Sequence, residues 1–208
     1  MSKKANTGGL LNVLNGKMGI SAPHRSVPVI KLINKHNPKS YDELETLIEY
    51  HYLNDCECGI KSQGTVYDFG KNLYNAQREY WGENKFTLEE CIKWEYDLFI
   101  INSLKGSKME NKAIIELKKE LPSKYTITNS ESFIDEEYRV DLEIKKENKI
   151  VLGIQVKPIS YKFTRYEVKS FNKIRNSQYK NKVEYLYYND DEEFTNIPII
   201  IEFLTNND

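Results

Sequence analysis

The spacing of apolar residues changes from a helical to an alternating pattern about halfway along the chain. In the first half, Ser or Thr is followed three residues later by Glu or Asp at three places, which begin at Ser40, Thr65 and Thr87. Apolar residues at helical spacing follow each of these pairs. Such pairs are typical of capping boxes, which satisfy the free N–H groups of a helix start. Gly106 is expected to end the last of these helices. The pattern predicts a mainly helical region over residues 1–104.

From residue 105 onward the pattern predicts helices and strands in a mixed order. The expected elements are a helix near residues 107–121, strands at 125–128, 138–144 and 150–158, a helix at about 166–178, and strands at 182–188 and 197–203. Successive strands joined by a short polar turn pair as antiparallel hairpins. We therefore expect an α/β (α+β) fold, in which residues 105–208 form a core of a helix, a three-stranded antiparallel region, a second helix and further strands in a mixed sheet.

The strand within VLGIQVKPIS, Val151–Ser160, carries two polar residues on one face. Successive side chains of a strand point to opposite faces, so Gln155 and Lys157 lie opposite the apolar residues of this segment. A buried ammonium group is costly unless it is paired or in contact with water. This face of the strand is therefore expected to open onto a cleft.

The preceding strand is expected to bring a carboxylate to the same face. Alternation in YRVDLEI places Asp141 on the face away from the apolar residues of that strand, of which Val140 is the first. Pairing through the turn KKENK would bring Asp141 close to Gln155 and Lys157. Carboxylate and amide oxygens are ligands that Mg²⁺ accepts, and a nearby ammonium can orient a water or stabilise negative charge on phosphate.

These residues resemble a known nuclease motif. Asp141 followed after a hairpin by Gln155-Val156-Lys157 resembles the PD-(D/E)XK nuclease motif in its QxK variant, and the segment Lys105–Leu117 resembles the helix that enters this fold and supplies an acidic residue. More narrowly, GIQVKPISY, VDLEI and KWEYDLFIINSLKG are similar to type II restriction endonucleases of the MjaI kind. The resemblance implies Mg²⁺-dependent hydrolysis of double-stranded DNA at a short palindromic site by a homodimer, with a cognate DNA methyltransferase as functional partner. At the subfamily level a CTAG-type site is the first target to try.

The resemblance also assigns roles to individual residues. It implies that Asp141, Gln155, the Val156 carbonyl and a helix carboxylate hold Mg²⁺, and that Lys157 positions and activates the attacking water. Gln155 stands where the motif usually has Asp or Glu, which removes a negative charge. Mg²⁺ binding is then weakened unless another carboxylate compensates.

Glu110 is the candidate for the compensating carboxylate. It lies centrally on the apolar face of the helix expected near residues 107–121, which is unusual for a solvated residue. Two alternatives remain at this point: Ser107 and Glu110 also fit a capping box, and Glu116, at the edge of the same face, could serve instead.

Basic residues are concentrated in two stretches although the net charge is only −1. Residues 1–36 contain six basic and no acidic residues, and residues 157–182 contain eight basic residues and one acidic residue. Such stretches suit contact with phosphate, and solvated helix faces are the alternative reading. The residues expected to contact DNA are Lys17, Arg25, Lys162, Arg165, Lys169, Lys173 and Arg175.

Two other functions fit the same residues. The PD-(D/E)XK core also serves Holliday-junction resolvases and repair nucleases. A DNA-binding protein with a degenerate, inactive core is the non-enzymatic alternative, with Gln155 as the sign of lost activity. Such a protein would bind DNA in a salt-sensitive way without cleaving it.

The cysteines favour a reducing compartment. Cys56, Cys58 and Cys91 are odd in number and lack the spacing of a disulfide framework. There is also no apolar run of membrane-spanning length and no N-terminal secretion signal, so a cytoplasmic location is expected. Cys56 and Cys58 with the upstream His51 could be read as a zinc site, but this spacing is more typical of ordinary packing. The three histidines form no cluster along the sequence.

Overall fold

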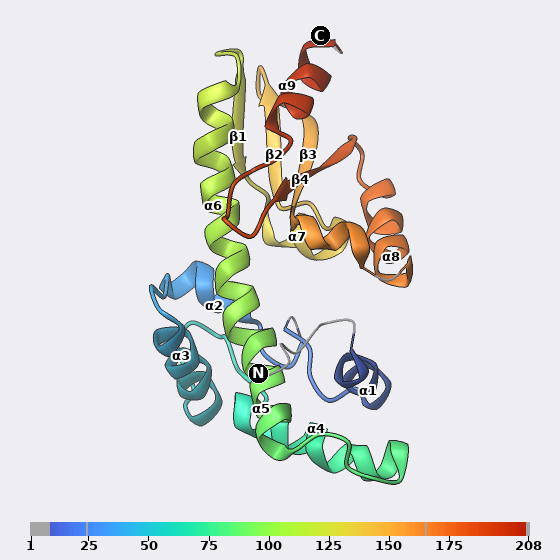
Figure 1. Ribbon diagram of the computed structural model, residues 1–208. Coiled ribbons are helices and arrows are strands. Elements are labelled where there is room, and N and C mark those ends of the chain that lie inside the picture. The colour runs from blue at the N-terminus through green and yellow to red at the C-terminus, as the bar shows by residue number, and fades with distance from the viewer. Residues whose placement is uncertain (1–8, 24, 165, 207–208) are drawn as a thin grey trace. The chain divides into compact units, whose positions relative to one another are not determined.

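The computed structural model describes residues 9–23, 25–164 and 166–206 and divides the protein into two compact units, residues 1–107 and 108–208 (Figure 1). None of the helices in these described stretches has both the length and the apolar character needed to cross a lipid bilayer.

The N-terminal unit is helical, as the sequence predicts. Its elements are α1 (Leu10–Met18), α2 (Val29–His36), α3 (Tyr41–Leu53), α4 (Val66–Trp81), α5 (Leu88–Tyr96), a π-helical turn (Asp97–Ile101) and the start of α6 (Asn102–Glu120). The predicted capping residues are confirmed: the side chain of Ser40 accepts a hydrogen bond from the Glu43 amide, and full capping boxes begin α4 and α5. Two buried apolar clusters form the interior of this unit.

The expected helix end at Gly106 is wrong. Gly106 lies inside α6, which runs without a break from Asn102 to Glu120. A glycine inside a helix costs about 1 kcal/mol relative to alanine. Burial of Met109, Ala113 and Leu117 on the following turns outweighs that cost, because packing of an apolar face supplies most of the stability of a helix in a protein.

The C-terminal unit is built on a four-stranded mixed sheet. Its strands are β1 (Tyr125–Asn129), β2 (Leu142–Lys146), β3 (Lys149–Pro158) and β4 (Val183–Tyr188), in the order β1-β2-β3-β4. The first three are antiparallel, and β4 is parallel to β3. The remaining helices are α7 (Ser132–Tyr138), α8 (Tyr166–Ser177), α9 (Ile197–Asn206) and a 3-10 turn (Ile159–Phe163). This arrangement confirms the expected α+β class, antiparallel region and mixed sheet.

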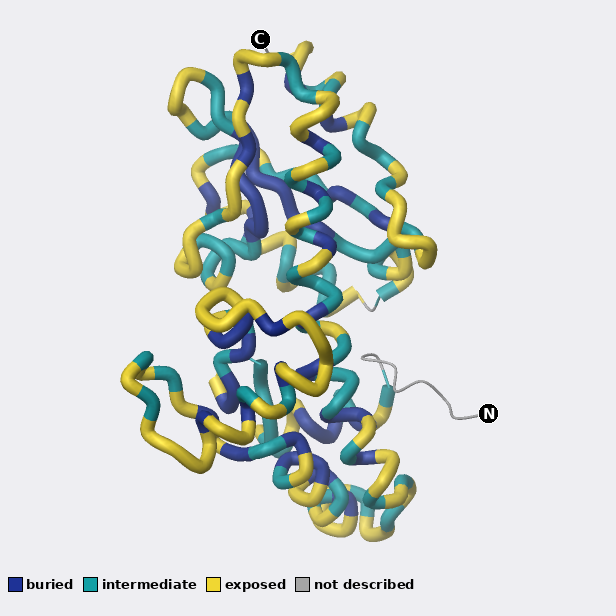
Figure 2. The backbone as a smooth tube through the Cα atoms, turned by 90° about the vertical axis from the view of Figure 1, so that its left-hand side faces the viewer, coloured by how far each residue is buried: buried dark blue, intermediate teal, exposed yellow. Residues whose placement is uncertain are grey.

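One face of the sheet carries the core. Apolar residues of α6 and α9 pack against β2 and β3 in one cluster. Figure 2 shows buried backbone in the middle of this unit. The cluster includes Met109, Leu117, Ile144, Leu152, Ile154, Ile200 and Leu204. The opposite face of β3 carries Gln155 and Lys157. The sheet thus separates an apolar core from a polar face.

Two predicted strands need correction. Residues 138–144 were expected to be extended, but α7 occupies Ser132–Tyr138, Arg139 has a left-handed backbone with φ of 59°, and β2 begins only at Leu142. The alternation of side chains between the two faces of the strand does not extend back to Val140. A residue with a side chain at position 153 would place its Cβ 3.0 Å from the Val140 Cγ1. Val140 therefore lies on the Gly153 side of the sheet. Residues 197–203 form the start of α9 instead of a strand.

Candidate active site

Asp141 is fixed at the start of β2 by two backbone contacts to β3. Its N–H donates to the Ile154 carbonyl at 2.9 Å, and its Oδ2 accepts from the Val156 N–H at 2.7 Å. The Lys157 Nζ lies 4.0 Å from the same Oδ2. The hairpin thus brings Asp141 and Lys157 together, as strand pairing predicts, and it does so although the extended segment is shorter than expected.

Gln155 lies two residues before Lys157 on β3 and is buried, with 1% of its surface exposed. Its Oε1 has no hydrogen-bond partner among the residues that the structure describes. Buried polar atoms are almost always paired, because an unpaired one costs about 1–3 kcal/mol. An unpaired buried amide oxygen on the same strand as Lys157 has the chemistry of a ligand for a cation.

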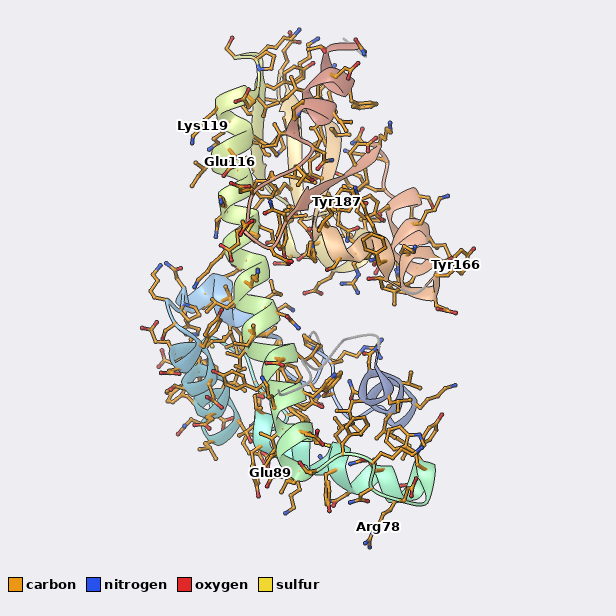
Figure 3. All side chains as sticks on the ribbon, in the orientation of Figure 1. Arg78, Glu89, Glu116, Lys119, Tyr166 and Tyr187 are labelled. Carbon is orange, nitrogen blue, oxygen red and sulfur yellow. The ribbon has the colours of Figure 1, made fainter. Side chains whose placement is uncertain are left out.

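Two further carboxyl groups reach this place from helices. Glu110 comes from α6 and Asp135 from α7, and both are close enough to Asp141 and Lys157 for these charges to shift their pKa values. Ser107 lies within α6, so Glu110 does not cap a helix start and the capping-box alternative is wrong. The other alternative, Glu116, pairs with Lys112 on the same helix at 3.6 Å. Figure 3 marks Glu116 on α6.

All three carboxyl groups have raised pKa values. Loss of solvent is the largest cause at each, and repulsion from Asp141 adds to it at Glu110 and Asp135. The pKa of Asp135 rises to about 7, and that of Glu110 rises well above its usual range. The Lys157 charge opposes the rise at each carboxyl, and at Asp141 the Val156 N–H and a hydrogen bond from Asp135 oppose it further. The Arg139 charge also opposes the rise at Asp135 and Asp141, but the pKa of each of the three carboxyl groups remains raised.

This donor set fits a divalent metal ion. Three carboxyl groups and an unpaired amide oxygen are hard oxygen donors of the kind that Mg²⁺ takes, and a bound cation would favour ionised carboxylates where burial disfavours them. The residues that could hold the ion are Asp141, Gln155, Glu110 and Asp135.

The sequence pattern did not predict Asp135 as a residue of this site. It lies in SFIDEEY, which no alternation or helical face marked, and its importance depends on the short helix α7 folding back toward β2. Arg139, four residues later, lowers the pKa of Asp135 but lies beyond the end of α7 with a left-handed backbone, so helical spacing in the sequence gave no signal for Asp135.

A row of tyrosines borders the polar face of β3. Tyr185 and Tyr187 on β4 pair in register with Gln155 and Lys157. Tyr161 stacks on Tyr185 with ring centroids 5.6 Å apart, and Tyr185 stacks on Tyr187 at 5.9 Å. With Lys169, Lys173 and Lys182 these rings line a surface pocket of about 620 Å³. Tyr187 is marked in Figure 3.

The expected DNA-contacting residues fall into several places. Lys17 and Arg25 are exposed in the N-terminal unit, and Lys162, Lys169 and Lys173 lie near or on α8. Lys162 Nζ is 4.4 Å from the centre of the Tyr187 ring. Arg175 makes an ion pair with Glu137 of α7. Arg165 lies outside the described residues.

One comparison identifies relatives of this chain. The family model described as MjaI restriction endonuclease matches residues 8–200. No curated protein and no solved structure matches the chain significantly. The match spans nearly the whole chain and confirms the resemblance to restriction endonucleases of the MjaI kind, so the chain belongs to the MjaI restriction endonuclease family, a family of endodeoxyribonucleases.

Proposed function

We propose that this protein is a type II restriction endonuclease that hydrolyses both strands of DNA at a short palindromic site with Mg²⁺ as cofactor. The observation that carries the proposal is the proximity of Glu110, Asp135 and Asp141 to Lys157, on the strand that also carries the unpaired Oε1 of Gln155. The family match supports DNA as the substrate.

The proposed metal ligands are Asp141, the Gln155 Oε1, the Val156 carbonyl and Glu110. Asp135 is the additional carboxylate that compensates for the uncharged Gln155, since it adds a negative charge next to Asp141. When bound, Mg²⁺ supplies Lewis acidity: it polarises a water and neutralises charge on the scissile phosphate.

Lys157 is the residue proposed to act on the attacking water. Its side chain keeps 25% of its surface exposed, whereas that of Asp141 keeps 7%. The Lys157 ammonium therefore reaches both the buried carboxylate and the solvent at the edge of the polar face. From there it can orient a water and stabilise the negative charge that develops on phosphate. The Val156 N–H holds the Asp141 carboxylate in place for this geometry.

The DNA backbone is proposed to follow the tyrosine row toward α8. Lys162, Lys169 and Lys173 supply positive charge beside Tyr185 and Tyr187, which are the β4 neighbours of Gln155 and Lys157. Cutting two antiparallel strands with one site per chain requires two copies related by a two-fold axis, so the proposed active form is a homodimer. A cognate DNA methyltransferase would protect the host sites.

The test is cleavage of a long mixed-sequence DNA with Mg²⁺ or with EDTA. Discrete fragments that need Mg²⁺ are expected from the wild type and none from Lys157→Ala, which should still bind DNA. Lys145→Ala is the matched control, because Lys145 pairs with Glu143 at 3.6 Å on the same sheet and has no proposed part in catalysis. Retained cleavage by Lys157→Ala would remove Lys157 from the mechanism.

The same assay separates the alternatives. Cleavage of a four-way junction without cleavage of duplex DNA would identify a resolvase. Salt-sensitive DNA binding without cleavage in any divalent metal would identify a non-catalytic DNA-binding protein. Asp141→Ala is expected to lose cleavage and Mg²⁺ affinity together, and an unchanged Mg²⁺ titration would defeat its assignment as a ligand.

A further inference from the structure

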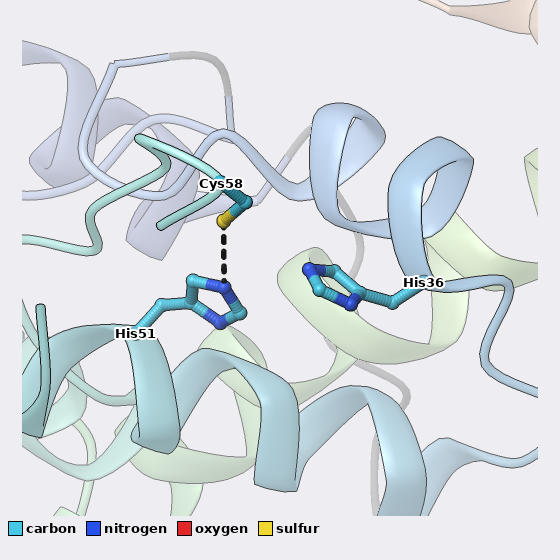
Figure 4. A group of neighbouring side chains, drawn as sticks. All are labelled: His36, His51 and Cys58. Carbon is cyan, nitrogen blue, oxygen red and sulfur yellow. Dashed lines mark hydrogen bonds between the residues drawn. The ribbon is translucent and has the colours of Figure 1, made fainter. Parts of the chain in front are cut away.

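The N-terminal unit contains a second group of metal-binding side chains. His36 comes from the last residue of α2, His51 from the last turn of α3, and Cys58 from the turn after α3. One donor atom of each lies within 4.8 Å of the other two (Figure 4). The imidazole ring centres are 5.0 Å apart, so the expectation that the histidines form no cluster is wrong for this pair.

His51 is held in the orientation of a metal ligand. Its Nδ1 lies 2.7 Å from the Leu47 carbonyl oxygen, which can only accept, so Nδ1 carries the proton. The lone pair of Nε2 then points toward the Cys58 Sγ, 3.2 Å away. The His51 ring is fully buried, which fixes this orientation. Histidines that bind metals usually donate their other ring N–H to a carbonyl or carboxylate in this way.

Cys56 supplies a fourth donor. The Cys58 N–H donates to the Cys56 Sγ at 3.4 Å, and the two thiol groups are close enough to hydrogen-bond, so the Cys56 sulfur lies next to Cys58. The turn closes at Gly59, whose φ of +73° suits glycine and whose N–H donates to the Cys56 carbonyl at 3.0 Å.

We propose that His36, His51, Cys56 and Cys58 bind one Zn²⁺ in a closed tetrahedral site. Zinc–sulfur bonds of about 2.3 Å and zinc–nitrogen bonds of about 2.0 Å place neighbouring ligand atoms about 3.5 Å apart. The donors of His36, His51 and Cys58 need only a small contraction to reach these distances, and the Cys56 Sγ, which lies next to Cys58 but outside that group of three, moves in as the fourth ligand. Two sulfurs and two imidazoles suit zinc, and four protein ligands leave no position for a catalytic water. The ion would join the ends of α2 and α3 to the turn that follows α3, as a structural element of this unit.

The site is tested first by metal analysis of protein purified without chelators. The wild type is expected to contain one zinc per chain, and Cys58→Ser is expected to lose it. Cys91→Ser is the matched control, because Cys91 is buried away from this group and its removal should leave the zinc in place. Asp141→Asn should also retain it, which separates this site from the cation proposed at the carboxylates.

Cobalt substitution keeps the test independent of whether Cys58→Ser folds. Wild-type protein loaded with Co²⁺ should show thiolate-to-cobalt charge-transfer absorption and the strong visible bands of tetrahedral Co²⁺. X-ray absorption of the zinc protein should show two sulfur and two nitrogen neighbours. A wild type without zinc that gives no such absorption with Co²⁺ would overturn the proposal, as would a folded Cys58→Ser variant with full zinc content.

Discussion

Two buried glutamines give opposite expectations for the same substitution. Gln77 and Gln155 have 0% and 1% of their surfaces exposed. The Gln77 Oε1 accepts from the Lys85 and Phe86 amides at 2.9 and 2.8 Å, and its Nε2 donates to the Phe86 carbonyl at 3.0 Å. The Gln155 Oε1 has no partner among the described residues. Methionine has nearly the length of glutamine but makes no comparable hydrogen bonds, so it removes the polar atoms with little change in volume.

The magnitudes follow from what each substitution leaves behind. Gln155→Met removes an unpaired oxygen whose burial costs about 1–3 kcal/mol, and the variant is expected to gain about 1 kcal/mol in the free energy of unfolding without Mg²⁺. That gain corresponds to about 2–4 °C in Tm for a chain of this size. Gln77→Met leaves the Lys85 and Phe86 amides without an acceptor and is expected to lose about 3 kcal/mol.

Urea unfolding in Mg²⁺-free buffer measures both changes. Trp81 and Trp94 lie in the N-terminal unit, so tryptophan fluorescence reports Gln77→Met, and far-UV circular dichroism is needed for Gln155→Met. Added Mg²⁺ at about 100 times its Kd should stabilise the wild type by about 2.7 kcal/mol, and this increase should be absent from Gln155→Met. A loss of stability in Gln155→Met without Mg²⁺ as large as that in Gln77→Met would refute the reasoning.

Three further predictions concern other residues. Burial raises the pKa of Glu95 to about 7, although hydrogen bonds from Ser21 oppose the rise. The stability that neutral Glu95 contributes is fully present below about pH 4.5 and is lost as the pH rises through about 7, so the free energy of unfolding measured with urea should fall by roughly 3 kcal/mol between pH 5 and pH 9. The same fall between these pH values in Glu95→Gln would contradict this. Gly70→Ala should lower the free energy of unfolding by about 1–3 kcal/mol in thermal melts, because the new Cβ would lie 2.6 Å from the Ile92 Cα. Gly16→Ala, with nothing within 4 Å of the new Cβ, should raise the free energy of unfolding by about 0.5–1 kcal/mol, and a fall of similar size in both variants would show that the contact with Ile92 is not the cause. Asp135→Asn should raise the Mg²⁺ concentration for half-maximal cleavage about tenfold relative to Glu136→Gln, and an identical Mg²⁺ titration in the two variants would exclude Asp135 from the metal site.

Local patterns predicted the elements whose causes lie within a few residues. Side-chain hydrogen bonds at Ser40, Thr65 and Thr87 begin helices wherever the following residues can be helical, and the sequence therefore placed these helix starts correctly. The β2–β3 hairpin was likewise predictable, because alternation and a polar turn determine strand pairing locally.

The missed elements depend on tertiary contacts. Residues 197–203 are rich in isoleucine and read as a strand, but Ile200 and Leu204 are buried four residues apart, which is the spacing of a helix packed on the sheet. His36 and His51 come together only because α2 and α3 fold against each other. No rule based on spacing along the sequence predicts that contact.

The carboxylate site also has a consequence for when activity can arise during synthesis. Its groups come from α6, α7, the start of β2 and the end of β3, and β3 gains its parallel neighbour only when β4 has been made. Translation delivers these segments in that order, at about 5–20 residues per second. A nascent chain that has left the ribosome only as far as β2 lacks Gln155 and Lys157, two of the residues proposed for catalysis. With the function proposed above, the order of these elements would delay DNA cleavage until β3 and its neighbour β4 have been made, which would protect the DNA of the cell that makes the protein.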